Sequence, residues 1–111
     1  MKKRILLLVF LIFLSSTLYA QLISESAISN LSGFNNIQRV MYKSDIVYLL
    51  DSYYLISVDI SRPSNPAILD SLQMGDWTLA MDIQGNIAFV TAGTYLYAID
   101  ISQPDNLTLI V

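Results

Sequence analysis

The sequence predicts an all-β fold made of about two four-stranded antiparallel sheets, packed as blades of an incomplete β-propeller. Two observations predict it. Residues 37–70 align with residues 78–111 without a gap, at a period of 41 residues, and eight of the 34 pairs are identical. Each copy also divides into four short β-prone segments that are separated by turn residues. A four-stranded repeat of about 40 to 45 residues is typical of a propeller blade.

The turn residues place the strands within each copy. In the second copy the expected strands cover about residues 79–84, 87–91, 95–101 and 107–111. Gly85-Asn86 predicts a two-residue hairpin turn between the first two strands, because both residues tolerate positive φ. Ser44-Asp45 occupies the same place in the first copy with weaker turn chemistry.

The second and third strands of each copy are apolar on consecutive residues rather than on alternate ones. Residues 46–50 and 87–90 show this pattern most clearly. Such strands need cover on both faces. A sheet that is sandwiched between two neighbouring sheets satisfies this need, as a propeller blade does. Stacked β-solenoid turns are the alternative, but their repeats are usually shorter, at about 20 to 30 residues.

Each copy carries the same motif, Asp-Ile-Ser-x-Pro-x-Asn, after its third strand. Its members are Asp59, Ser61, Pro63 and Asn65 in the first copy and Asp100, Ser102, Pro104 and Asn106 in the second. One hypothesis is a calcium site, with Asp59 and Asp100 as oxygen ligands. The other is a structural turn, in which Asp and Ser accept backbone N–H bonds and Pro fixes φ. The turn is favoured because the spacing of a calcium-binding loop is absent.

Together with Gly-Asn-x-Ala-x-Val at residues 85–90, this motif resembles the LVIVD repeat, which occurs in exported and surface β-propeller proteins of bacteria and archaea. The resemblance covers residues 37–111. It is close in the second copy and weaker in the first, where Ser44-Asp45 replaces Gly-Asn. It implies a propeller with binding or structural roles and brings no defined active site.

The first twenty residues have the pattern of a secretory signal peptide. Lys2, Lys3 and Arg4 precede the apolar residues 5–14, and Ala20 is the expected cleavage point. An uncleaved anchor is the alternative, although a membrane span needs about 20 apolar residues. Removal leaves three basic residues against nine acidic ones, a formal charge of −6. We therefore expect export to the periplasm, cell surface or medium, no membrane span after cleavage, and no nucleic-acid partner.

The chain contains no cysteine and no histidine. It therefore has no disulfide, no cysteine for a lipid anchor, and none of the usual imidazole or thiolate ligands of zinc, copper or iron. The common general base and the strong nucleophile are missing too. Asp51 and Asp82 could form a catalytic carboxylate pair, but nothing in the sequence brings them together. We expect no cofactor and no enzymatic activity.

Three residues are candidates for ligand binding: Asp76, Trp77 and Arg62. Trp77 is the only tryptophan and precedes a strand that would line the central channel, where an indole could stack on a sugar, contact a partner or simply pack at the rim. Five tyrosines share this ambiguity and are expected mainly in the blade cores; they are Tyr42, Tyr53, Tyr54, Tyr95 and Tyr97.

These patterns favour an exported, non-catalytic β-propeller module that binds a protein or glycan or displays a neighbouring domain. The alternative is the N-terminal part of a periplasmic propeller enzyme whose catalytic residues lie in further blades. The expected division is a signal peptide at 1–20, a segment at 21–36 with a possible closing strand at 28–32, and blades at 37–77 and 78–111. Two blades cannot close a ring, so further blades in cis or self-association are expected.

Overall fold

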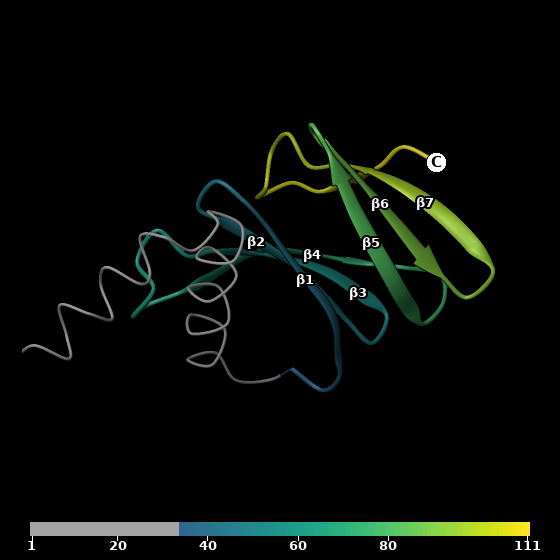
Figure 1. The fold of residues 1–111 in the computed structure, drawn as a ribbon, viewed down its shortest axis with the longest axis horizontal. Helices are drawn as coiled ribbons and strands as arrows, with labels where there is room; N and C mark the ends of the chain where they lie inside the picture. The colour runs from purple at the N-terminus through teal and green to yellow at the C-terminus, as the bar shows by residue number, and fades with distance from the viewer. Residues whose placement is uncertain (1–33) are drawn as a thin grey trace, which may run out of the picture.

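The computed structural model describes residues 34–111, which form two separate four-stranded antiparallel sheets and contain no helix (Figure 1). The first sheet, blade 1, has the order β1-β2-β3-β4, and the second, blade 2, has the order β5-β6-β7-β8. The strands are β1 (Ile37–Lys43), β2 (Ile46–Asp51), β3 (Tyr54–Asp59), β4 (Ala67–Gln73), β5 (Thr78–Gln84), β6 (Ile87–Ala92), β7 (Tyr95–Asp100) and β8 (Thr108–Leu109). The predicted all-β blades are confirmed. Antiparallel pairing within each sheet is not the parallel stacking of a β-solenoid.

Two-residue turns connect the first three strands of each blade. In every one of these turns the first central residue has a positive φ, 55° at Ser44 and Ser52 and 58° at Gly85 and Gly93. Positive φ at that residue alone is the pattern of a type II′ turn, which suits the twist of a hairpin. The two-residue turn expected at Gly85-Asn86 is present, and it needs a positive φ only at its first residue, Gly85.

The main hydrophobic core lies between the two sheets, in the space between the blue-to-teal and green-to-yellow ribbons of Figure 1. It contains Tyr48 and Leu55 of blade 1 and Val90 and Ile99 of blade 2, all at most 1% exposed. Burying an aliphatic side chain of this size contributes about 1.5–3 kcal/mol. The innermost strands approach each other as well, since β5 lies against β1 and β2.

Blade 1 is buried on both faces, as its consecutive apolar residues predicted. The face turned away from blade 2 carries a second buried cluster that includes Val47, Leu49 and Val58. Blade 2 differs, because its outer face is open. Leu96 is 62% exposed, whereas Leu55, the residue 41 positions earlier, is fully buried.

The predicted signal peptide and the predicted closing strand at residues 28–32 lie outside the described part of the chain. Within residues 34–111, no helix is long and apolar enough to span a membrane.

Candidate functional site

The antiparallel strands sort the loops into two edges of the molecule. The DIS edge holds the turns at 44–45 and 85–86 and the loops at 60–66 and 101–107. The crossover edge holds the turns at 52–53 and 93–94 and the segment at 74–77 that leads from blade 1 to blade 2. Strands of six or seven residues separate the two edges by about 20 Å, because each strand residue rises about 3.3 Å.

At the DIS edge, each aspartate of the repeated motif accepts a hydrogen bond from the residue two positions later. The Oδ1 atom of Asp59 lies 2.8 Å from the amide nitrogen of Ser61, and Oδ1 of Asp100 lies 2.8 Å from that of Ser102. The pKa of Asp59 is lowered, chiefly by the bond from the Ser61 amide, and the pKa of Asp100 is lowered, chiefly by the Ser102 hydroxyl. Hydrogen bonds to a carboxylate favour its charged form.

The next residues of the motif form a four-residue turn. The amide of Asn65 donates to the carbonyl of Arg62 at 2.8 Å, which places Pro63 second in the turn, where its fixed φ is suitable. In blade 2 the amide of Asn106 donates to the carbonyl of Gln103 at 2.9 Å. The same residues therefore make the same bonds in both blades, which supports the interpretation of the motif as a structural turn.

In the described part of the chain, the calcium candidates Asp59 and Asp100 do not belong to a cluster of acidic residues. Within residues 34–111, no group of three acidic or other metal-ligating residues gathers at one place. One carboxylate oxygen of each aspartate is already bonded to its own turn. The geometry of the motif is that of a turn shared by both blades.

The crossover edge contains two of the predicted ligand-binding candidates, Asp76 and Trp77. The ring of Trp77 packs edge-to-face on Tyr53, with ring centroids 5.2 Å apart and planes at 81°. Asp76 accepts a hydrogen bond from the Trp77 amide at 2.7 Å. Buried Thr78 fixes the segment, because its amide and its hydroxyl both donate to the carbonyl of Ser52 at 2.8 Å. This aromatic pair therefore sits on a rigid support.

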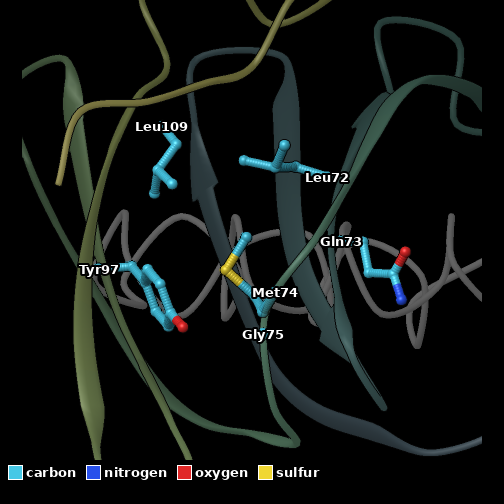
Figure 2. Close-up of a pocket in the computed structure, with 6 residues that line it drawn as sticks. All are labelled: Leu72, Gln73, Met74, Gly75, Tyr97 and Leu109. Carbon is cyan, nitrogen blue, oxygen red and sulfur yellow. The ribbon is translucent and has the colours of Figure 1, made fainter.

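A groove of about 260 Å³ lies between the outer strands of the two blades, where residues 74–75, just before Trp77 in the chain, form part of its wall (Figure 2). It is lined by Leu72, Gln73, Met74, Gly75, Tyr97 and Leu109. Figure 2 shows Tyr97, Met74 and Leu109 converging on the groove, while the amide of Gln73 points away from it. The groove therefore offers an apolar wall with the Tyr97 hydroxyl as a polar group, a composition common in ligand sites.

Three of the tyrosines expected in the blade cores lie at the surface. Tyr53, Tyr54 and Tyr95 are 44%, 38% and 64% exposed, so the core prediction is wrong for them. All three are in or beside the β2–β3 and β6–β7 turns, where the strands end and neighbouring side chains no longer cover them. Tyr42 and Tyr97 are partly buried against the two core clusters, as expected.

The remaining candidates are Arg62, Asp51 and Asp82, and each has its own surroundings. Arg62 is exposed at the DIS edge, so the structure does not bring it to Trp77. Asp51 is buried, and its carboxylate accepts the backbone amides of Asn35 at 3.2 Å and Asn36 at 2.5 Å. Asp82 is exposed and accepts a bond from the side-chain amide of Gln84 at 2.9 Å. The two carboxylates thus have separate structural partners.

The repeated turns indicate a known repeat family, and comparison with family models identifies that family. The LVIVD repeat matches residues 36–73 and 79–111. This chain belongs to the LVIVD repeat family. Each match covers one four-stranded sheet, so each LVIVD repeat here is one blade of a β-propeller-like module. Neither the curated proteins nor the solved structures contain a match to the chain.

Four side chains that the sequence patterns did not indicate join the two LVIVD repeats. Lys43 donates to the Gly85 carbonyl at 2.5 Å, and Tyr48 donates to the Ile101 carbonyl at 3.4 Å. Ser57 donates to the Pro104 carbonyl at 2.5 Å, and Asp70 accepts the Leu107 amide at 2.8 Å. Each comes from a different strand of the first repeat, and each bonds to backbone at the DIS edge of the second.

These contacts could have been found in the sequence by comparing the two LVIVD repeats position by position. The equivalents of Lys43, Tyr48, Ser57 and Asp70 in the second repeat are Gln84, Phe89, Ala98 and Val111. All four have lost the charge or hydroxyl that the first repeat uses. Positions that differ between copies therefore mark the contact between the blades as well as possible ligand sites.

Proposed function

We propose that this LVIVD module is exported, binds a protein or a glycan through its crossover edge, and catalyses no reaction. The observation that carries the proposal is the exposed aromatic surface of that edge. Tyr53 pairs with Trp77, and Tyr95 lies 6.3 Å from Tyr97, measured between ring centroids. Aromatic side chains lose little conformational entropy on binding and dominate the binding energy of many interfaces.

The shape and support of the crossover edge favour a binding role. The groove beside Met74 and Tyr97 offers apolar surface to an incoming side chain or sugar face. The segment that carries Trp77 is fixed by the bonds from Thr78 to Ser52, and the Met74 amide donates to the Tyr53 carbonyl at 2.6 Å. A rigid site loses less entropy on binding than a flexible one.

Two features of the chain support the other parts of the proposal. The basic residues Lys2, Lys3 and Arg4 ahead of an apolar run favour export. The absence of histidine and cysteine from the sequence removes the most common catalytic groups. The carboxylate of Asp51 is held by backbone amides, which is a structural use of that group.

Site-specific photo-crosslinking tests the proposed binding edge and captures the ligand in the same step. A benzophenone amino acid replaces Tyr53 at the crossover edge and, in the matched control, Arg62 at the DIS edge. We expect a covalent adduct from position 53 and none from position 62 when the producing cells are irradiated. Mass spectrometry of the adduct then distinguishes a peptide from a glycan. Adducts from position 62 alone, or from neither position, contradict the proposal.

The sole tryptophan gives a second measurement at the same edge. Binding of a ligand at Trp77 should shift or quench its fluorescence, and Tyr53→Ala should weaken that binding because it removes the partner ring. Arg62→Ala should leave the affinity unchanged. A ligand whose affinity depends on Arg62 and not on Tyr53 would place binding at the DIS edge instead.

A further inference from the structure

A second groove lies on the face of blade 1 that turns away from blade 2. We call it groove 1, and we call the groove of Figure 2 groove 2. Groove 1 also has a volume of about 260 Å³, and its wall includes the apolar side chains of Phe34, Ile56 and Ile68. Asn35 and Ser71 add polar groups to it. Like groove 2, it therefore combines an apolar wall with a few polar groups, which is a composition common in ligand sites.

The two grooves are related by the sequence repeat. Phe34, Ile56 and Ile68 of groove 1 lie 41 positions before three residues of groove 2, which are Gly75, Tyr97 and Leu109. Each blade thus builds one groove from its third strand, its fourth strand and the segment before its first strand. Two equivalent grooves are suited to a ligand that itself repeats, as the sugar units of a polysaccharide do.

The aromatic pair of the crossover edge lies between the two grooves. Ser52 and Tyr54, the neighbours of Tyr53 in the chain, both line groove 1. The Tyr53 carbonyl accepts the amide of Met74 at 2.6 Å, and Met74 lines groove 2. Trp77 packs on the ring of Tyr53. A ligand that extends from one groove to the other along the crossover edge therefore passes over these two rings.

The side chains along this path can bind both parts of a sugar unit. The apolar C–H face of a sugar ring packs on an aromatic ring, and its hydroxyl groups bond to carboxylate and amide groups. Asp76 and Asn35 supply such groups, and both are exposed. Asp76 uses one carboxylate oxygen to accept the Trp77 amide, and a carboxylate can accept about four hydrogen bonds in total. It can therefore accept sugar hydroxyl groups as well.

The charges of the described chain favour an uncharged ligand at this edge. The basic residues within residues 34–111 are Arg39, Lys43 and Arg62. Arg62 lies at the DIS edge, Lys43 bonds to Gly85 at that same edge, and Arg39 lies within β1. Carboxylate and phosphate groups are usually bound by arginine or lysine. An acidic glycan would meet the exposed carboxylate of Asp76 without a basic partner beside it.

We propose that the ligand of the crossover edge is an uncharged polysaccharide whose chain extends from groove 1, over Tyr53 and Trp77, to groove 2. This inference rests on the proposed binding function of the edge and adds the class and the extent of the ligand. A protein ligand would present different side chains to the two grooves, whereas a polysaccharide presents the same unit to both. The repetition of the grooves thus favours the polysaccharide.

Photo-crosslinking from inside the two grooves tests the path of the ligand. Ile68 of groove 1 and Leu109 of groove 2 are equivalent residues of the two repeats, and they are 51% and 54% exposed. A benzophenone amino acid replaces each in turn, and Leu96, which is 62% exposed and lines neither groove, is the matched control. In irradiated producing cells we expect a glycan adduct from positions 68 and 109, as from position 53, and none from position 96.

The outcomes separate this inference from the proposed function. An adduct from position 53 that is missing at position 68 or at position 109 leaves the binding function in place and overturns the extended path. Protein adducts from these positions overturn the polysaccharide and retain binding at the edge. No adduct from positions 53, 68 and 109 contradicts the binding function itself, and this inference with it.

Defined oligosaccharides test the class of ligand on the purified protein. Maltohexaose, cellohexaose and chitohexaose are uncharged, whereas hexagalacturonate is acidic. We expect at least one uncharged probe to change the fluorescence of Trp77. Ile68→Arg and Leu109→Arg should each raise its Kd by about tenfold or more, because the larger side chain fills one groove. Leu96→Arg should leave the Kd unchanged, and circular dichroism verifies that the three variants fold. A response to none of the uncharged probes, or an equal response to hexagalacturonate, overturns the proposal.

Discussion

At the scale of single residues, the two blades form the same hairpin turns with different residue types. The first central residue of each hairpin turn has a φ of 55° to 58°, and blade 1 uses Ser44 and Ser52 where blade 2 uses Gly85 and Gly93. A residue with a Cβ atom pays about 1–2 kcal/mol for this conformation, and glycine does not. The weaker turn chemistry that the sequence indicated for blade 1 therefore has a definite conformational cause.

The two glycines have the same φ but different surroundings, which gives a matched prediction. A Cβ atom at Gly85 would meet nothing within 4 Å, whereas at Gly93 it would overlap the Asp76 side chain, including its Cβ at 2.9 Å. We expect Gly85→Ala to lower the free energy of unfolding by about 1 kcal/mol from φ strain alone. Gly93→Ala should lower it further, as measured by urea denaturation.

The control for this pair removes the overlapping side chain. Asp76→Gly in the Gly93→Ala background should bring the cost of the alanine down to that of Gly85→Ala. If Gly85→Ala and Gly93→Ala lower the free energy of unfolding equally in the unmodified chain, the nearby Asp76 side chain does not disfavour a larger residue at position 93.

The motif aspartates predict how stability responds to acid. Both Asp59 and Asp100 have a lowered pKa in the folded chain, because Ser61 and Ser102 donate to them. A carboxyl group whose pKa is lower in the folded state than in the unfolded state stabilises the fold at pH values above its unfolded pKa of 3.8. This stabilisation is lost as the pH falls through the folded-state pKa. The double variant Asp59→Ala/Asp100→Ala should therefore have a lower Tm at neutral pH and a smaller loss of Tm below about pH 4.

Two controls separate the turn from a metal site. Asp→Asn substitutions keep an oxygen acceptor for the serine amide and should retain more of the Tm than Asp→Ala. Added Ca²⁺ should leave the Tm of the unmodified protein unchanged. A rise in Tm with Ca²⁺ that Asp100→Asn abolishes would restore the calcium hypothesis.

At the scale of strands, a pair of positions has exchanged large and small side chains between the repeats. In blade 2 the Tyr97 hydroxyl lies over Gly75, at 2.7 Å from the place of a Cβ atom. The equivalent pair in blade 1 is Ile56 and Phe34, and Phe34 packs against the cluster that contains Ile56. The aromatic ring thus comes from β7 in one blade and from the segment before β1 in the other.

This exchange predicts a coupled pair of substitutions. Gly75→Ala should lower the free energy of unfolding by about 1 kcal/mol, because Gly75 is exposed and the new methyl group has to displace only the end of the Tyr97 side chain. Tyr97→Phe removes the hydroxyl, so Gly75→Ala should cost less in that background. A double-mutant cycle in urea measures the coupling. Additive effects would mean that the ring of Tyr97 moves freely and that the exchange has no energetic consequence.

The sequence predicted the strands well because their signals are local. Consecutive apolar residues and two-residue turns located β2, β3, β6 and β7, with bounds that differ from the expected ones by one residue. It predicted β8 too long, at 107–111 rather than Thr108–Leu109. There the amides of Ile110 and Val111 both donate to the Ala98 carbonyl, at 2.7 and 3.3 Å, so regular pairing ends.

The site was less predictable because its parts come from different strands. Trp77 was identifiable as the only tryptophan, but its partner Tyr53 lies in the previous blade and was expected in a core. The Tyr97–Gly75 contact also joins two elements, and neither residue has a motif around it. Such contacts depend on how the sheets pack, which local sequence patterns do not encode.

At the scale of the whole molecule, the contact between the blades is both apolar and polar. Tyr48 combines the two, because its ring lies in the shared core and its hydroxyl reaches the Ile101 carbonyl at 3.4 Å. Burial raises the pKa of Tyr48 above its ordinary value of 10.0. A group whose pKa is higher in the folded state than in the unfolded state stabilises the fold at pH values below its unfolded pKa. This stabilisation is lost as the pH rises through the folded-state pKa. The interface should therefore weaken in alkali.

Tyr48→Phe tests this dependence with the side chain that the second repeat carries at position 89. The variant should lose about 0.5–1.5 kcal/mol near neutral pH, since it removes one hydrogen bond. Above about pH 10 its Tm should fall less steeply than that of the unmodified protein. Tyr53→Phe is the control, because Tyr53 is 44% exposed, and its pH profile should match the unmodified one. Identical profiles for Tyr48→Phe and the unmodified protein would contradict the role of Tyr48.

The outermost contact between the blades is the bond from the Leu107 amide to the Asp70 carboxylate, at 2.8 Å. Leu107 is 5% exposed and belongs to the shared core, so loss of Asp70 leaves a buried donor without its partner. We expect Asp70→Ala to lower the free energy of unfolding by about 1–3 kcal/mol. Hydrogen exchange at the Leu107 amide should accelerate, while exchange within the β2–β3 pair of blade 1 stays slow. Asp70→Asn keeps an acceptor oxygen and should preserve much of the protection. Faster exchange at Leu107 alone requires that the blades separate before either blade unfolds. If exchange instead accelerates equally throughout both blades, the hydrogen bond stabilises the whole fold and not specifically the packing of blade 2 on blade 1.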